Sequence, residues 1–175
     1  RRVGHRADHV AGARQDFREA GEPLAGENGE DEFARGEIGD ARIKSGELLA
    51  EIVIPRRNLG KPADFQKFGL RKGQALALVN VAASLWVDWD KHAFVAPRIA
   101  LGAVAPTVMR APEAEAFLEA RAITPEAMEE AGRIAAAEAM PISDFRAPAQ
   151  YRRDLVAVLT RRALANAVAR ATTRR

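Results

Sequence analysis

The sequence contains no cysteine, and this absence removes several kinds of chemistry at once. Without thiols the chain holds no disulfide, no iron–sulfur cluster and no cysteine-based zinc site, and it has no thiol nucleophile. Any redox role therefore has to use a cofactor that the chain binds or shares. Histidine is also scarce, with three residues in 175.

Long hydrophobic runs are absent as well. The longest apolar stretch, residues 75–87, is interrupted by Asn80 and Ser84 and is shorter than the roughly 20 residues that span a bilayer as a helix. The first residues, RRVGHRADH, show no apolar signal-peptide core and no initiator methionine. We predict a cytoplasmic protein without a membrane span, in a chain that begins within a longer gene product.

The nucleotide-binding and hydrolase motifs G-x-G-x-x-G, Walker A, H-E-x-x-H and G-x-S-x-G do not occur in the chain. His5 and His9 share one face only if their segment is helical, and that segment lacks a helical apolar stripe. Asp88, Asp90 and His92 resemble a ligand cluster, but a polar hairpin turn accounts better for them. We therefore predict no metal site and assign no acid, base or nucleophile.

Apolar residues make up 47% of the chain, which suffices for one sizeable core or two small ones and excludes a wholly disordered protein. The 27 basic and 24 acidic residues nearly balance, so the net charge of +3 does not by itself indicate nucleic-acid binding. Residues 1–31 show neither helical nor strand periodicity, and we predict that they are poorly ordered.

Period-two patterning begins after this segment. Strands are predicted at 49–54, which ends at Pro55, and at 65–70. A third is predicted at 75–87, where Val79, Val81, Ala83, Leu85 and Val87 form an apolar face opposite Asn80, Ser84 and Asp88. The alternation resumes after the turn at 88–92, with Ile99, Leu101 and Ala103 on one side. Together these segments predict an antiparallel meander, and Ala100, Gly102 and Ala103 leave room for another element to pack closely on its last strand.

Helical patterning follows Pro106. Pro112 and Pro125 stand at helix starts, and a third, longer helix is predicted over 149–169 with an apolar cluster of Tyr151, Leu155, Val158 and Leu159. Strands first and helices after predict an α+β fold: a small antiparallel sheet of three to four strands followed by three helices packed on one face.

The basic C-terminus has two interpretations. Residues 146–175 carry eight arginines against one acidic residue, which is compatible with nucleic-acid binding. However, Arg152, Arg153, Arg161 and Arg162 ring a helix at 100° per residue instead of forming one stripe. Arg162 falls in the arc of Leu155 and Leu159, which predicts a contact with a carboxylate or carbonyl in the fold or at an interface. A structural or subunit-interface role is favoured over nucleic acid.

Lys67 is the charged residue inside the second predicted strand, between Phe65 and Phe68. A strand lysine on a solvated face is common. The alternative is a contact with a phosphate or the edge of a cofactor, for which an ammonium on a rigid strand is well suited.

Four segments carry a family resemblance, in order and with suitable spacing: GELLAEIVIP, FQKFGLRKGQALALVNVAASLWVD, APRIALGAVAPTVMRAPEAEAFLEA and EAMPISDFRAPAQYRRDLVAVLTRRALANAV. Together they resemble the C-terminal domain of the FAD-binding medium subunit of molybdenum hydroxylases, the family of carbon monoxide dehydrogenase flavoproteins and xanthine dehydrogenases. The resemblance covers 33–168. It divides the chain into an unmatched segment 1–31, a remnant of the lead-out from a flavin domain at 32–46, and the C-terminal-like domain at 47–171.

The resemblance implies that the domain completes an FAD pocket and docks partner subunits. In this family electrons pass from a molybdopterin-binding large subunit through two-iron two-sulfur clusters of a small subunit to the flavin. The position of Lys67 contributes a side-chain contact to FAD and that of Leu49 a backbone contact. The substrate is chosen in the molybdenum subunit and is not readable here.

Two departures from the family pattern stand out. Gly73 and Gln74 replace an acidic residue that many relatives carry after the basic pair, and the two glycine-rich loops that hold the FAD pyrophosphate are absent. We therefore expect a fragment that is inactive and binds no FAD tightly alone. The alternative is a non-catalytic α+β interaction module without flavin.

Overall fold

The computed structural model of the chain describes residues 54–71, 73 and 76–173. The predicted segments 1–31 and 32–46 lie outside the described residues, as do Leu49 and, apart from Ile54, the strand predicted over 49–54. After a short 3₁₀ turn at Arg56–Asn58 the elements are β1 Ala63–Gly69, β2 Ala77–Asp88, β3 Ala93–Gly102, β4 Met109–Arg110, α2 Pro112–Leu118, α3 Pro125–Glu138 and α4 Ala149–Thr173.

The four strands form one antiparallel sheet in the order β1-β2-β3-β4, which confirms the predicted meander. Lys67 pairs with Asn80 across β1 and β2, and Asn80 pairs with Gly102 across β2 and β3. The two-residue strand β4 extends the sheet by pairing Met109 and Arg110 with Leu101 and Ala100. The connections between neighbouring strands are short, as expected for a meander.

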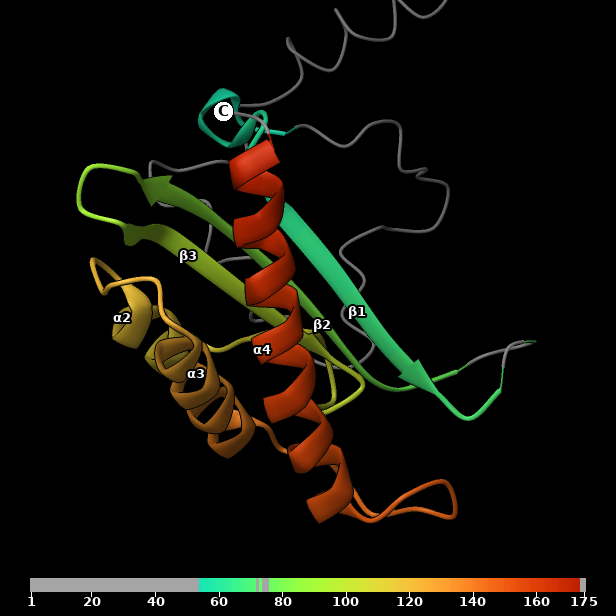
Figure 1. The fold of residues 1–175 in the computed structure, drawn as a ribbon. Coiled ribbons are helices and arrows are strands. Elements are labelled where there is room, and N and C mark those ends of the chain that lie inside the picture. Colours follow the sequence, from blue (N-terminus) through green and yellow to red (C-terminus); the bar gives the residue numbers. More distant parts are fainter. Residues whose placement is uncertain (1–53, 72, 74–75, 174–175) are drawn as a thin grey trace, which may run out of the picture. The chain divides into compact units, whose positions relative to one another are not determined.

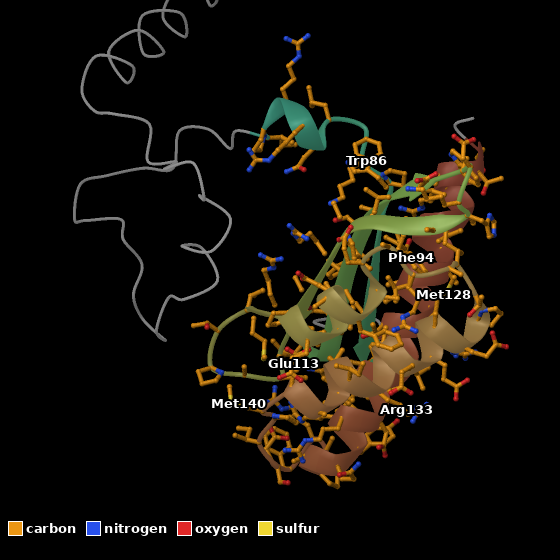
Figure 2. The ribbon with its side chains drawn as sticks, turned by 90° about the vertical axis from the view of Figure 1, so that its left-hand side faces the viewer. Trp86, Phe94, Glu113, Met128, Arg133 and Met140 are labelled. Atoms are coloured by element: carbon orange, nitrogen blue, oxygen red, sulfur yellow. The ribbon has the colours of Figure 1, made fainter. Side chains whose placement is uncertain are left out.

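The core lies between the helices and one face of this sheet. Val79, Val81, Ala83 and Leu85 of β2, which alternate as the sequence predicted, are buried together with residues of β3 and the helices. Figure 1 shows α4 crossing the sheet in front of β1 and β2, with α2 and α3 beside it, and Figure 2 shows Phe94 of β3 and Met128 of α3 on the side where the helices pack. The predicted α+β fold is confirmed.

Helix starts follow the predicted signals. Pro112 and Pro125 occupy the first helical positions of α2 and α3, and the Thr124 side chain accepts a hydrogen bond of 3.1 Å from the backbone N–H of Ala127. The N-terminus of α2 is capped from another helix, because Glu138 at the end of α3 accepts hydrogen bonds from the backbone N–H groups of Glu113 and Ala114. Burial raises the pKa of Glu138, and the two hydrogen bonds offset part of that rise.

The buried stripe of α4 differs from the predicted cluster. Tyr151 and Val158 are 44% and 38% exposed, and the buried residues include Val156, Leu159 and a series of small ones. Helices α3 and α4 approach so closely that a Cβ added to Gly132 would lie 2.5 Å from the backbone oxygen of Ala157. Large side chains do not fit in such a contact, so the prediction holds for Leu159 and the partly buried Leu155 but is wrong for Tyr151 and Val158.

Two smaller predictions are also corrected. Ala103 does not continue the inward face of β3, because it follows the strand in the left-handed region, with φ of 64°, and is exposed. Arg162 is exposed, so the predicted contact inside the fold is wrong, while a contact at an interface stays a prediction. The arginine of α4 that is buried against carbonyls and a carboxylate is Arg152.

The guanidinium of Arg152 joins three parts of the chain. Its side chain is 3% exposed, and Nη1 donates to the backbone oxygens of Leu78 at 3.4 Å and Ala103 at 3.3 Å, at the ends of β2 and β3. Nη2 donates to Asp144 Oδ1 at 2.7 Å. A buried cation is tolerated only when it is paired and hydrogen-bonded, and these three oxygens supply the pairing.

We expect Arg152→Met to lower the free energy of unfolding by about 3 kcal/mol, because the substitution leaves the carbonyls of Leu78 and Ala103 without this donor and breaks an ion pair whose guanidinium is buried. Urea unfolding of the full chain measures the loss. Arg162→Met, on the exposed side of the same helix, is the matched control and should change stability by less than about 0.5 kcal/mol. Equal losses in the two variants would contradict this role for Arg152.

Asp64 anchors the other end of α4. Its side chain is 3% exposed and accepts a hydrogen bond of 3.0 Å from Asn166 Nδ2, while Arg170 Nη2 lies 2.6 Å from its Oδ1. Burial raises the pKa of Asp64, but the hydrogen bonds from Gln66 and Asn166 and the charge of Arg170 outweigh it, so that the net pKa lies below the ordinary 3.8.

A lowered pKa means that ionised Asp64 stabilises the folded state above its ordinary pKa, and this stabilisation is lost as the pH falls through the folded-state pKa. The free energy of unfolding should therefore decline between about pH 5 and about pH 2. Asp64→Asn should be less stable near neutral pH and should decline less steeply in acid. Chemical unfolding at a series of pH values checks both; an unchanged slope in the variant would refute the assignment.

Candidate functional site

Helices α2, α3 and α4 all pack against one side of the sheet, and none of the three lies on the other side (Figure 1). On β1, Asp64 and Phe68 contact α4 through Asn166 and Tyr151, so the alternate residues Phe65 and Lys67 lie on the opposite side. Directly paired residues of antiparallel strands share a face. The register places Ala63, Ser84, Arg98 and Arg110 on this side, together with six residues that we call the open face: Phe65, Lys67, Asn80, Ala82, Ala100 and Gly102.

Lys67 reaches solvent from the open face. Its side chain is exposed, and none of the described residues forms a hydrogen bond or an ion pair with it. Phe65, two residues earlier on the same face, is 59% exposed. The structure thus confirms that Lys67 lies on a strand and on its solvated side, as the sequence indicated, and leaves its ammonium available to a ligand.

Asn80 and Gly102 continue the row that begins with Lys67. A Cβ added to Gly102 would lie 2.3 Å from Asn80 Oδ1, so the carboxamide occupies the space that any other residue at 102 would fill. The sequence predicted that Gly102 leaves room for another structural element to pack closely. In the structure, the side chain of Asn80 on the neighbouring strand takes this room. Asn80 was recognised in the sequence as polar and outward-facing, but its spacing gave no signal of a site.

Arg98 and Arg110, which pair with Ser84 and Ala100 and so share the side of Lys67, are already engaged. Glu115 of α2 is 6% exposed and accepts hydrogen bonds from the backbone N–H of Ile99 at 2.8 Å and from the Arg110 side chain. Arg98 Nη1 lies 4.0 Å from the same carboxylate. These two arginines fix α2 to the sheet.

The open face is held in place by the Arg152 contacts. Leu78 and Ala103, whose backbone oxygens accept from Arg152, are near neighbours of Asn80 and Gly102 along β2 and β3. Val79 and Val81, which flank Asn80 on β2, are fully buried. The backbone that carries the row Lys67–Asn80–Gly102 is therefore fixed from the helical side of the sheet.

The remaining candidates from the sequence are the possible metal ligands, the turn at 88–92, a membrane span and Leu49. Within residues 54–71, 73 and 76–173 no cluster of histidine and carboxylate side chains is suited to a metal ion. The Asp88 carboxylate accepts hydrogen bonds from the backbone N–H groups of Asp90 and Lys91, which makes a polar hairpin turn. In the described part of the chain, none of the helices combines the length and apolarity needed to cross a membrane. Leu49 lies outside the described residues.

Comparison with known proteins gives consistent results. The model of the CO dehydrogenase flavoprotein C-terminal domain family matches residues 64–167. The chain is 34% identical over 129 residues to the carbon monoxide dehydrogenase medium chain of Afipia carboxidovorans and 33% identical over 128 residues to the nicotine 6-hydroxylase medium subunit of Paenarthrobacter nicotinovorans. These matches cover 74% and 73% of the chain, and in each case 44% of the relative.

Among solved structures, a carbon monoxide dehydrogenase from Hydrogenophaga pseudoflava, which lacks the Mo-pyranopterin moiety of the molybdenum cofactor, superimposes with a TM-score of 0.59 at 34% identity. This match covers 63% of the chain and 38% of the solved one. The chain therefore spans less than half of the length of the relatives that it matches.

Proposed function

The chain belongs to the family of CO dehydrogenase flavoprotein C-terminal domains, and from this premise we propose that it completes the FAD pocket of a molybdenum hydroxylase medium subunit. The observation that carries the proposal is the ammonium of Lys67, which projects without a described partner from the rigid open face. A lysine in this position offers three donors and a positive charge to oxygen atoms of a ligand.

The chemical character of the open face fits a flavin. Ala82 and Ala100 give it a low surface, on which a planar ring can approach the sheet, and Lys67 and Asn80 supply polar contacts beside them. FAD, when bound, supplies the one- and two-electron chemistry. The role of the chain is to hold the cofactor, to exclude water from one side of it and to place a positive charge nearby.

Other parts of the proposal come from the family alone. Leu49 is proposed to give FAD a backbone contact. The molybdopterin-binding large subunit and the iron–sulfur small subunit are the proposed partners in an oxidoreductase complex, and the cytoplasm is the proposed location. None of these depends on an acid, base or nucleophile of this chain.

The proposal is tested by producing the chain together with a separate flavin domain of a family member, which carries the glycine-rich loops. We expect the purified complex to retain FAD, and we expect Lys67→Ala to weaken its retention about tenfold, as loss of one charge-assisted hydrogen bond does. Flavin absorbance after dialysis measures occupancy. Lys91→Ala, which removes an 80% exposed lysine at the β2–β3 turn, is the matched control and should retain FAD.

If the complex forms but retains no flavin, the proposed function is wrong and the interaction module without flavin becomes the better interpretation. If FAD is retained equally by the wild type, Lys67→Ala and Lys91→Ala, the domain completes the pocket without Lys67.

A specific observation favours an interaction role in addition. The loop 139–148 presents the Phe145 side chain with 97% of its surface exposed, next to Ile142 at 69% and Met140 at 62%. Exposed apolar side chains grouped in this way are typical of protein–protein contacts. We propose that this loop contacts a partner subunit.

The loop is ordered by its own hydrogen bonds. Asp144 accepts from the backbone N–H groups of Arg146 and Ala147, from the Arg146 side chain and from buried Arg152. The bond from Arg146 lowers the pKa of Asp144 well below its usual range and outweighs the smaller opposing effect of burial, with Arg152 adding to the lowering. The Arg146 guanidinium carbon lies 5.6 Å from the centre of the Phe145 ring. Because the loop is ordered before binding, little conformational entropy is lost on contact.

We expect Phe145→Ser to weaken association with the purified large and small subunits of a carbon monoxide dehydrogenase about tenfold or more, since exposed aromatic anchors dominate interface energies. Surface plasmon resonance measures the affinity, and thermal unfolding should be unchanged because the ring is exposed. Leu59→Ser, another exposed apolar residue at 61%, is the control and should bind normally. Equal affinity of Phe145→Ser and the wild type would remove the loop from the interface.

A further inference from the structure

Asn80 occupies an unusual position for its residue type. It lies within β2, an inner strand between β1 and β3, where asparagine is depleted because its side chain competes for backbone hydrogen bonds and packs poorly. No described residue forms a hydrogen bond with its carboxamide. Nothing in the packing of the sheet therefore explains why an asparagine stands there.

The neighbouring strand is adapted to this side chain. Gly102 is the cross-strand partner of Asn80, and a Cβ there would lie 2.3 Å from Asn80 Oδ1 and 2.9 Å from its Cγ. Gly102 is the last residue of β3, and a glycine there loses stability through backbone entropy and missing packing. Its presence indicates that the space above Gly102 is needed, and the carboxamide of Asn80 fills it.

Asn80 is also directly opposite Lys67, so the two side chains leave neighbouring points of the open face on the same side of the sheet. They differ in chemistry. The lysine ammonium only donates hydrogen bonds, whereas the carboxamide donates through its NH₂ group and accepts through its oxygen. A pair of this kind matches a planar heterocycle whose edge alternates carbonyl oxygens with an N–H group, as the pyrimidine part of a flavin does.

We propose that Asn80 is a second ligand-contacting residue of the open face, whose carboxamide hydrogen-bonds the carbonyl and N–H edge of the flavin ring beside Lys67. This inference rests on the proposed function, because it takes FAD as the ligand. Gly102 acts as a positioning residue that admits the carboxamide. Val79 and Val81, both fully buried, hold the strand on either side of Asn80 and fix the direction in which its side chain leaves.

The direct test is nuclear magnetic resonance of the full chain, labelled with nitrogen-15 and bound to the separate flavin domain, before and after FAD is added. We expect the side-chain NH₂ signals of Asn80 to shift on FAD binding. The chain holds an internal control, since the NH₂ group of Asn166 is hydrogen-bonded to Asp64 on the helical side of the sheet and should not move. FAD binding that leaves the Asn80 signals unmoved overturns the inference.

Variants give a second readout. Asn80→Ala should weaken FAD retention about tenfold, and Asn80→Asp, which keeps the acceptor and loses the NH₂ donor, should also weaken it. Gly102→Ala keeps Asn80 but displaces its carboxamide. This variant should retain less FAD, and the shift of the Asn80 NH₂ signals on FAD binding should become smaller to the same degree. A merely structural role of Asn80 would instead lower thermal stability and leave the affinity of the folded protein for FAD unchanged.

The two proposals fail in different ways. If wild-type FAD retention depends on Lys67 but the Asn80 variants bind FAD normally, the inference about Asn80 is wrong and the proposed function stands. If the complex retains no FAD, both are wrong.

Discussion

The buried guanidinium of Arg152 is the contact on which the arrangement of the described domain depends. It lies in the first turns of α4 and reaches the last residues of β3, the first residues of β2 and the loop before its own helix. The Arg152 side chain is 3% exposed, so its guanidinium keeps a fixed position. Breaking a contact of a buried cation costs more free energy than breaking an exposed ion pair. One residue therefore aligns the helix, the sheet and the loop 139–148.

A second anchor makes this alignment complete. Arg170 and Asn166 bind Asp64 near the far end of α4, so the helix is held to the sheet at both ends. The small residues between the anchors allow α3 to pack closely on α4, and α2 is fixed to the edge of β3 by Glu115. All three helices consequently cover one face (Figure 1), and the opposite face carries Lys67 and Asn80.

The same network separates the two surfaces that we propose to be functional. The open face lies on one side of the sheet, and Phe145 is displayed by a loop that Arg152 and Arg146 brace through Asp144. A domain that completes a cofactor pocket with one surface and contacts a partner with another has to hold the two surfaces at a fixed distance and orientation. Polar contacts between rigid elements achieve this with greater geometric precision than apolar packing alone, because hydrogen bonds are directional.

The sequence by itself determined the order and type of the elements, since period-two apolar alternation, proline at helix starts and the change to helical spacing are local properties. It also identified Lys67 on a solvated strand and the family to which the chain belongs. It did not reveal that Arg152, and not Arg162, is buried, nor that small residues form the contact of α4. Those facts depend on which elements meet. Only the tertiary structure set Asn80 against Gly102 and opposite Lys67, because strand pairing joins residues that lie well apart in the sequence.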